Sequence, residues 1–249
     1  MEHYWLDLPG PVWFSGAHLY RRFVESVSAP AVAVELGAWK GRSACFMGVE
    51  IANSGKPIRF TTVDHWQGSA DEELHGADPD VQAGRLYEVF ARNIEQVADY
   101  VNVISAESSP AAATFDDGSI DFLYIDASHT YDAVLRDLAA WYPKVKEGGV
   151  ISGDDWCFPD RGELGVRNAV QDFFRPTLSE LTIEPGSAPN EKWLQWSIVK
   201  RPNMTIASTA ELKRAAFRRT LIRMLTARRL RHWLRRARSP RPNSRTPGA

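Results

Sequence analysis

The stretch Ala31–Ser43, AVAVELGAWKGRS, contains an apolar run, an acid followed by glycine, and a small-residue turn that leads into a helical pattern. The apolar run is typical of a buried parallel strand that ends near Glu35 and Gly37. In an open α/β sheet, ligands bind in the crevice beyond the carboxyl ends of the strands. Glycines allow a ligand to approach bare backbone, and the N–H groups at the start of the next helix point toward it. We therefore expect a binding crevice here, with a plain strand-turn-helix connection as the alternative.

Strand and helix patterns alternate along the chain on both sides of this stretch. The expected strands are 31–34, which ends at Glu35-Leu36-Gly37, 59–63, 101–105, 120–125 and 150–152. The expected helices are 16–27, 42–52, 86–97, a short one at 110–115, 131–142 and 163–174. Two further strand patterns, 181–184 and 193–200, are joined by a loop that contains Pro, Gly and Asn, which indicates an antiparallel pair. Such alternation predicts an α/β fold with a doubly wound, mostly parallel seven-stranded sheet. The polar connection 65–84 is long for a compact domain and indicates a lid, a binding loop or disorder.

The charge of the chain is unevenly distributed. The 249 residues carry a net charge of −1, but thirteen of the 30 Lys and Arg residues and only one acid lie between position 205 and the end. We therefore divide the chain into an N-terminal cap and helix (1–30), a central α/β domain (31–204) and a basic amphipathic helix with a disordered tail (205–249). The tail suits an anionic membrane surface. Docking on the acidic body or in a homo-oligomer fits its charge equally well, and nucleic acid is a weaker alternative.

Several protein classes do not fit this composition. Cys45 and Cys157 have neither disulfide-framework nor zinc-site spacing. The N-terminus lacks the basic and apolar regions of a signal peptide, and no apolar run reaches the length of a membrane span. We expect a cytoplasmic protein, and a location peripheral to the inner face of the membrane is one of the alternatives for its tail.

Acidic residues follow several of the expected strands. Asp64, which follows the second strand, stands where an acid accepts hydrogen bonds from the ribose hydroxyls of a nucleotide. The turn GAWKG lacks the third glycine of a GxGxxG pyrophosphate loop. This pattern favours a nucleoside without phosphates over a dinucleotide.

A second acidic group follows later strands and has a different chemistry. Asp126, Asp154 and Asp155 offer the oxygen ligands that Mg²⁺ prefers. His129 lies three residues after Asp126, and an imidazole with an ordinary pKa near neutrality is able to accept a proton from a substrate hydroxyl. Helix capping is the alternative role for each of these side chains taken alone. Together they predict a Mg²⁺ site with His129 as the base.

Four blocks of sequence resemble a known family. VELGAWKGRSA (34–44) resembles the first motif of the class I S-adenosylmethionine-dependent methyltransferases, and especially the metal-dependent catechol O-methyltransferase. IDASHTYDAV (125–134) and GGVISGDDW (148–156) are similar to the macrocin-type sugar O-methyltransferases. The resemblance covers about 31–156 and implies a Rossmann-like methyltransferase fold.

The resemblance also implies roles for individual residues. Glu35, Gly37, Trp39 and Ser43 would surround the methionine part of S-adenosylmethionine. Asp64 would bind the ribose, while Glu107 and Ser108 would border the adenine. Asp126, Asp154 and Asp155 would bind Mg²⁺, and Asp126 and His129 would be catalytic. Two departures stand out: Asp155 replaces an asparagine of the catechol enzyme and favours a divalent cation, whereas Ala106 replaces a common glycine and weakens the adenine assignment.

These observations predict an enzyme that transfers a methyl group from S-adenosylmethionine to a hydroxyl of a small molecule or a sugar, with Mg²⁺ assisting. Phenols and sugar hydroxyls both fit, and the macrocin-type blocks favour a sugar or glycoconjugate. The aromatic residues between Tyr4 and Phe14 and the connection 65–84 either line the acceptor pocket or form a plug over the sheet. The alternatives to this function are a nucleotide-dependent α/β enzyme of another class and a cofactor-binding module without catalysis.

Overall fold

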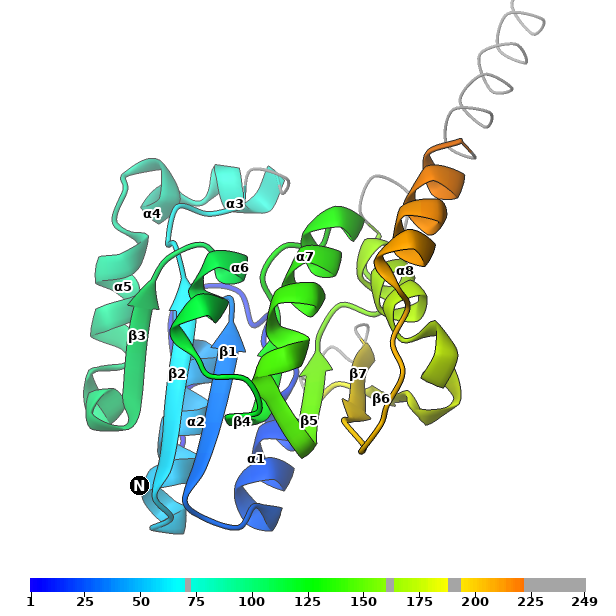
Figure 1. Cartoon of the computed structure of the whole chain (residues 1–249). Helices are drawn as coiled ribbons and strands as arrows, with labels where there is room; N and C mark the ends of the chain where they lie inside the picture. Colours follow the sequence, from blue (N-terminus) through cyan, green and yellow to red (C-terminus); the bar gives the residue numbers. More distant parts are fainter. Residues whose placement is uncertain (70–72, 160–163, 188–193, 222–249) are drawn as a thin grey trace, which may run out of the picture. The chain divides into compact units, whose positions relative to one another are not determined.

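Seven strands form one sheet with the order β3-β2-β1-β4-β5-β7-β6 in the computed structural model (Figure 1). The strands are β1 (Ala31–Leu36), β2 (Ile58–Asp64), β3 (Val101–Ser105), β4 (Ile120–Ile125), β5 (Val145–Gly153), β6 (Thr182–Pro185) and β7 (Leu194–Val199). The first five run parallel, whereas β7 is antiparallel to both β5 and β6. The predicted doubly wound sheet with a late antiparallel pair is confirmed. The structure describes residues 1–69, 73–159, 164–187 and 194–221.

Helices cover both faces of this sheet. One layer contains α1 (Ala17–Ser26), α2 (Arg42–Ser54) and α5 (Leu86–Asn93), and the other contains α6 (Ser108–Ala111), α7 (Tyr131–Trp141) and α8 (Gly165–Phe173) (Figure 1). Short 3₁₀ turns complete the connections at Glu95–Tyr100, Ala112–Thr114, Tyr142–Lys144 and Arg175–Glu180. Because successive crossovers use both faces, the central strands β1 and β4 are covered on each side.

Aromatic side chains fill the core under the α1 layer. The ring of Tyr20 meets the edges of Phe122 and Tyr124 at centroid distances of 5.4 and 4.9 Å, and Phe23 stacks on Phe122 at 4.8 Å. Burial of such large rings supplies much of the apolar free energy of folding. This packing attaches α1 to the sheet, so that the segment before β1 is part of the same compact unit, Met1–Ile206.

The connection 65–84 is more regular than the sequence suggested. It contains the short helices α3 (Glu73–Ala77) and α4 (Pro79–Gln82). The carboxylate of Asp78 accepts a hydrogen bond from the backbone N–H of Asp80, and Pro79 occupies the first helical position. An acidic N-cap followed by proline is a helix-start signal. The sequence-based prediction relied instead on the polarity of the whole segment and therefore missed these helices.

The region after Ile206 forms a second compact unit, Ala207–Ala249, which is described by itself. Residues 209–221 are helical, as the periodicity predicts, and the remainder of the predicted basic tail lies outside the described residues. Across the residues that the structure describes, no helix combines the length and apolar character that crossing a membrane requires.

Candidate active site

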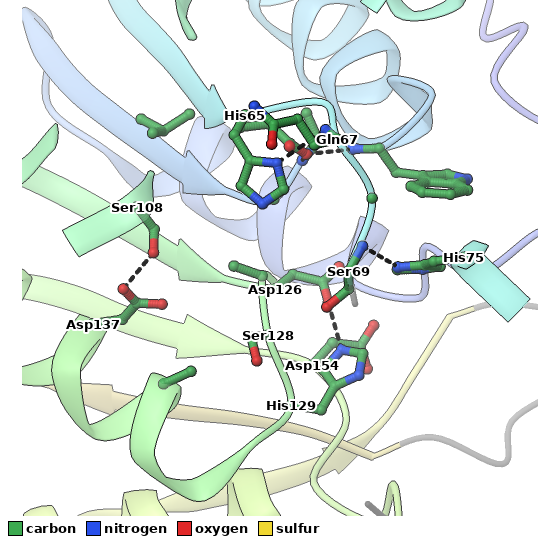
Figure 2. A pocket seen from close by; sticks show the side chains of 18 of the residues that line it. His65, Gln67, Ser69, His75, Ser108, Asp126, Ser128, His129, Asp137 and Asp154 are labelled. Carbon is green, nitrogen blue, oxygen red and sulfur yellow. Dashed lines mark hydrogen bonds and ion pairs between the residues drawn. The ribbon is translucent and has the colours of Figure 1, made fainter. Parts of the chain in front are cut away.

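A cavity of about 940 Å³ opens at the carboxyl ends of the parallel strands. Its lining comes from the ends of β1 to β5, from α7 and from the N-terminal segment before α1. All but one of the predicted site residues line it, namely Gly37, Trp39, Ser43, Asp64, Glu107, Ser108, Asp126, His129, Asp154 and Asp155. In Figure 2, Asp126, Asp154 and His129 gather on one side of the cavity, while Ser108 and Asp137 face each other on the other side.

The turn after β1 approaches the end of β4 very closely. Gly37 has a φ of +88°, and a Cβ atom built there would lie 1.9 Å from the carbonyl oxygen of Asp126. Any side chain would therefore force the two strand ends apart. Glycine at this position brings the predicted cofactor turn next to the residues that carry the proposed chemistry.

The carboxylate of Asp64 holds this turn in place. One oxygen accepts hydrogen bonds from the backbone N–H groups of Ala38 and Trp39 at 2.8 and 3.0 Å, and the other accepts from the N–H of Trp66 at 2.8 Å. A carboxylate offers about four acceptor positions, so three bonds still leave room for a ribose hydroxyl. Asp64 thus shapes the turn and also faces the cavity.

Glu35 is the predicted site residue that does not line the cavity. It is fully buried, and its two oxygens accept hydrogen bonds from the hydroxyls of Tyr20 and Thr62, each at 2.7 Å. Burial raises the pKa of this carboxyl to about 7, although the hydroxyls of Ser43, Tyr20 and Thr62 oppose the shift. Its predicted contact with the methionine part stays a prediction, and the geometry connects Glu35 to the cavity through Ser43.

Two acids and one imidazole form a cluster on the β4–β5 side of the cavity. Nε2 of His129 lies 2.7 Å from Oδ2 of Asp155 and 4.0 Å from Oδ1 of Asp126. One ligand atom from each of these three residues lies within 4.8 Å of the other two. Burial and the neighbouring acids raise the pKa of Asp126 well above its usual range, while His129 opposes that rise.

The backbone around His129 fixes the place of this cluster. Thr130 caps α7 by accepting a hydrogen bond from the N–H of Ala133. A Cβ atom at Gly165, the first residue of α8, would lie 2.1 Å from the carbonyl oxygen of His129. Asp155 itself adopts a left-handed φ of +60°, a conformation that nonglycine residues rarely adopt. Three separate constraints therefore converge on the imidazole and its acidic partner.

Asp154 lies outside the three-residue cluster because other partners hold its carboxylate. Oδ2 accepts from the hydroxyl of Ser15 at 2.9 Å, and Oδ1 accepts from the N–H of Asp155 at 2.7 Å and from Nε2 of Gln195. Burial raises the pKa of Asp154 to about 7, with the nearby Asp155 adding to the effect. The structure thus brings together two of the three predicted Mg²⁺ ligands and gives Asp154 a position from which it orients Asp155.

The donor set of the cluster fits a divalent cation. Carboxylate oxygens from Asp126 and Asp155 suit Mg²⁺, and the imidazole nitrogen of His129 would suit a transition metal as well. A cation between the two acids would also relieve the repulsion that raises the pKa of Asp126.

The connection 65–84 meets the cofactor turn over the cavity. Trp39 stacks on His75 with a centroid distance of 4.1 Å, and Trp13 lies 5.3 Å from Trp39. The ammonium group of Lys40 pairs with Asp78 at 2.7 Å and with Asp80 at 2.8 Å. The sequence analysis did not identify His75 or Lys40, because their roles depend on contacts between segments that are far apart in the chain.

Comparison with known proteins gives the same picture of the domain. Residues 34–156 match a family model described as a methyltransferase domain. Three solved structures share the fold: cofactor-bound Rv0187 from MTB, the O-methyltransferase NovP, and the O-methyltransferase from Bacillus cereus in complex with SAH. Their sequence identities are 18%, 20% and 18%, and their TM-scores are 0.55, 0.52 and 0.51. The matches cover 79%, 74% and 78% of this chain and 85%, 80% and 86% of the respective structures.

Proposed function

We propose that this chain, whose residues 34–156 match a methyltransferase domain, transfers a methyl group from S-adenosylmethionine to a hydroxyl oxygen. The observation that carries the hydroxyl assignment is the cluster of Asp126, His129 and Asp155 in the same cavity as the β1 turn. A hydroxyl needs to lose its proton as it becomes a nucleophile, and this cluster supplies a proton acceptor with two anionic neighbours.

His129 takes the proton in this proposal. As the acceptor oxygen attacks the methyl carbon, the C–S bond breaks, the sulfur leaves with the electron pair, and the hydroxyl proton moves to the imidazole of His129. The resulting imidazolium is paired with Asp155 at 2.7 Å and with Asp126 at 4.0 Å, which stabilises the charge that develops. Alignment of the two reactants in the cavity contributes the other part of the rate, up to about 7–11 kcal/mol in favourable cases.

Mg²⁺ assistance is part of the proposal. Asp126 and Asp155 would hold the ion, and Asp154 would orient Asp155 through the hydrogen bond from the N–H of Asp155 to Oδ1 of Asp154. A bound Mg²⁺ supplies Lewis acidity that lowers the pKa of an acceptor hydroxyl.

We favour a sugar or glycoconjugate hydroxyl as the acceptor. Trp13 and Trp39 line the cavity and offer flat apolar rings, on which the C–H faces of a sugar can pack. The resemblance of IDASHTYDAV and GGVISGDDW to the macrocin-type enzymes supports the same choice.

Calorimetric titration with S-adenosylmethionine, S-adenosylhomocysteine and NAD tests the cofactor first. We expect micromolar binding of the two sulfur nucleosides and none of NAD. A panel of sugars and phenols, assayed with Mg²⁺ and with EDTA, then tests the acceptor and the metal. Failure of both sulfur nucleosides to bind would refute the proposed function.

For the tail, we propose contact with an anionic membrane surface. The described helix 209–221 exposes 70% of Phe217 and 45% of Leu221, and it also carries Lys213, Arg214 and Arg218. Basic helices with exposed apolar residues bind the interface of anionic bilayers. In a sedimentation assay with phosphatidylserine vesicles, the full chain should appear in the pellet and a variant without 205–249 should stay in the supernatant. Equal sedimentation of both proteins would reject the proposal.

A further inference from the structure

The side of the cavity away from His129 forms a slot that is lined by two segments. One wall is the stretch 106–110 after β3, and the other is the face of α7 that carries Ala133, Arg136 and Asp137. The family resemblance implied that Glu107 and Ser108 border the adenine but gave no role to the facing helix. Asp137 is the buried acid of that helix, with an exposed fraction of 2%.

Two neighbouring serines hold Asp137 by the same oxygen. The hydroxyls of Ser108 and Ser109 donate to Oδ1 at 2.5 and 2.7 Å, and the indole N–H of Trp141 donates to the carbonyl oxygen of Ser108 at 3.0 Å. These contacts fix the rotamer of the carboxylate and tie α7 to α6. The acid is therefore rigidly positioned at the wall of the cavity.

The other oxygen of Asp137 has a different environment. Within the described part of the chain, Oδ2 accepts no hydrogen bond from the protein. This oxygen is also not completely enclosed by protein atoms, so a ligand can reach it. Figure 2 shows this oxygen turned away from Ser108. A buried carboxylate with one unused acceptor is costly unless a donor reaches it. Burial raises the pKa of Asp137, which reflects the same shortage of solvation.

We infer that Asp137 recognises the exocyclic amino group of adenine and thereby makes the cavity specific for an adenosyl cofactor. This assignment rests on the proposed function, because it requires a nucleoside in the slot. Adenine presents an N–H donor at position 6, whereas hypoxanthine presents a carbonyl oxygen there. A carboxylate oxygen attracts the first group and repels the second.

The test compares S-adenosylhomocysteine with S-inosylhomocysteine by calorimetry. We expect the unaltered protein to bind the adenosyl compound about 10-fold to 100-fold more tightly, because a charge-assisted hydrogen bond is replaced by repulsion. Equal affinities of the unaltered protein for the two compounds would already overturn the inference. Absence of binding by both compounds would overturn it together with the proposed function.

Asp137→Asn sharpens the result. The amide keeps an oxygen for the two serines and turns an NH₂ donor toward the slot, so we expect the preference to fall at least tenfold or to reverse in favour of the inosyl compound. Asp132→Asn, the same change at an exposed position of α7, serves as the control and should leave both affinities unchanged. A purely structural role for Asp137 would weaken both ligands equally and leave their ratio intact, which would overturn the inference.

Discussion

Two sets of acids lie at the same edge of the sheet and differ in what occupies their oxygens. Glu35, Asp64 and Asp154 accept hydrogen bonds from hydroxyls, backbone N–H groups or an amide of the protein itself. Asp126 and Asp155 instead face an imidazole in the cavity. A position at the end of a strand therefore does not determine the role of an acid. The partners determine it, and many of them come from distant parts of the chain.

The largest effect on turnover should come from the residues that face the cavity, Asp126, Asp155 and the imidazole of His129. We expect His129→Ala and Asp155→Asn to lower kcat by about 10²-fold to 10⁴-fold, because the acceptor hydroxyl loses its base or the partner of that base. The affinity for S-adenosylhomocysteine should change less than about twofold, since neither side chain belongs to the turn after β1. Steady-state kinetics and calorimetry on the same preparations measure the two quantities. Full activity in both variants would place the chemistry elsewhere.

Glu35 belongs to the acids that are hydrogen-bonded within the protein, and we expect it to make the stability of the fold depend on pH. Its pKa is about 7 in the folded protein against a usual value of 4.5, so the protonated form is favoured by folding. The stabilisation from this group is complete below pH 4.5 and is lost as the pH rises to 7. The difference between these two pKa values corresponds to a loss of about 3 kcal/mol in the free energy of unfolding.

Glu35→Gln mimics the protonated carboxyl and should remove this dependence. Between pH 4.5 and pH 7, urea unfolding of the unaltered protein should show a falling stability relative to the variant. Parallel stability curves for the two proteins across this range would mean that the environment of Glu35 holds a carboxylate as readily as water does.

The comparison also shows how far the sequence could lead. The apolar runs and the periods of the helices predicted all seven strands and their doubly wound arrangement, because each element is encoded within its own residues. Gly37, Asp64, Asp126, Asp154 and Asp155 were predicted for the same reason, since they follow those strands directly. The resemblance to methyltransferases, and not the strand pattern, indicated Trp39, Ser43, Glu107 and Ser108. The short helices α3 and α4 carried a local signal, the Asp78-Pro79 start, which the overall polarity of the segment concealed.

Long-range partners were beyond the sequence. Ser15 and Gln195 are 139 and 41 positions from Asp154, and their bonds to it exist only once α1 and β7 have packed beside β5. Nothing in the local pattern separates Asp154 from Asp155, which are adjacent and identical in type. Asp137 was missed because it lies in the middle of a helix, where an acid ordinarily faces solvent.

Asp64 accepts hydrogen bonds within the protein and also lines the cavity, so its substitution should affect both the turn after β1 and cofactor binding. Asp64→Ala leaves the N–H groups of Ala38, Trp39 and Trp66 without their acceptor, so the turn after β1 loses its shape. We expect the affinity for S-adenosylhomocysteine to fall by about 10-fold to 100-fold, as for the loss of a hydrogen bond to a charged group. The kcat at saturating cofactor should fall much less. Unchanged affinity would assign Asp64 to the scaffold alone.

The smallest effect should come from the two acids that are paired with the buried side chain of Lys40, away from the strand ends. Asp78 and Asp80 hold Lys40 at 2.7 and 2.8 Å, and this pairing joins the connection 65–84 to the cofactor turn. Because Asp78 and Asp80 are partly exposed and can be solvated once the ammonium group is removed, Lys40→Met should weaken the binding of S-adenosylhomocysteine about twofold to fivefold, which corresponds to roughly 0.4–1 kcal/mol. Raising NaCl from about 50 to 500 mM should weaken binding by the unaltered protein and change the variant less, because salt screens this pair. If Lys40→Met instead matched Asp64→Ala in its loss of affinity, charge pairing in this connection would be as important to the cavity as the hydrogen bonds of the strand-end acids.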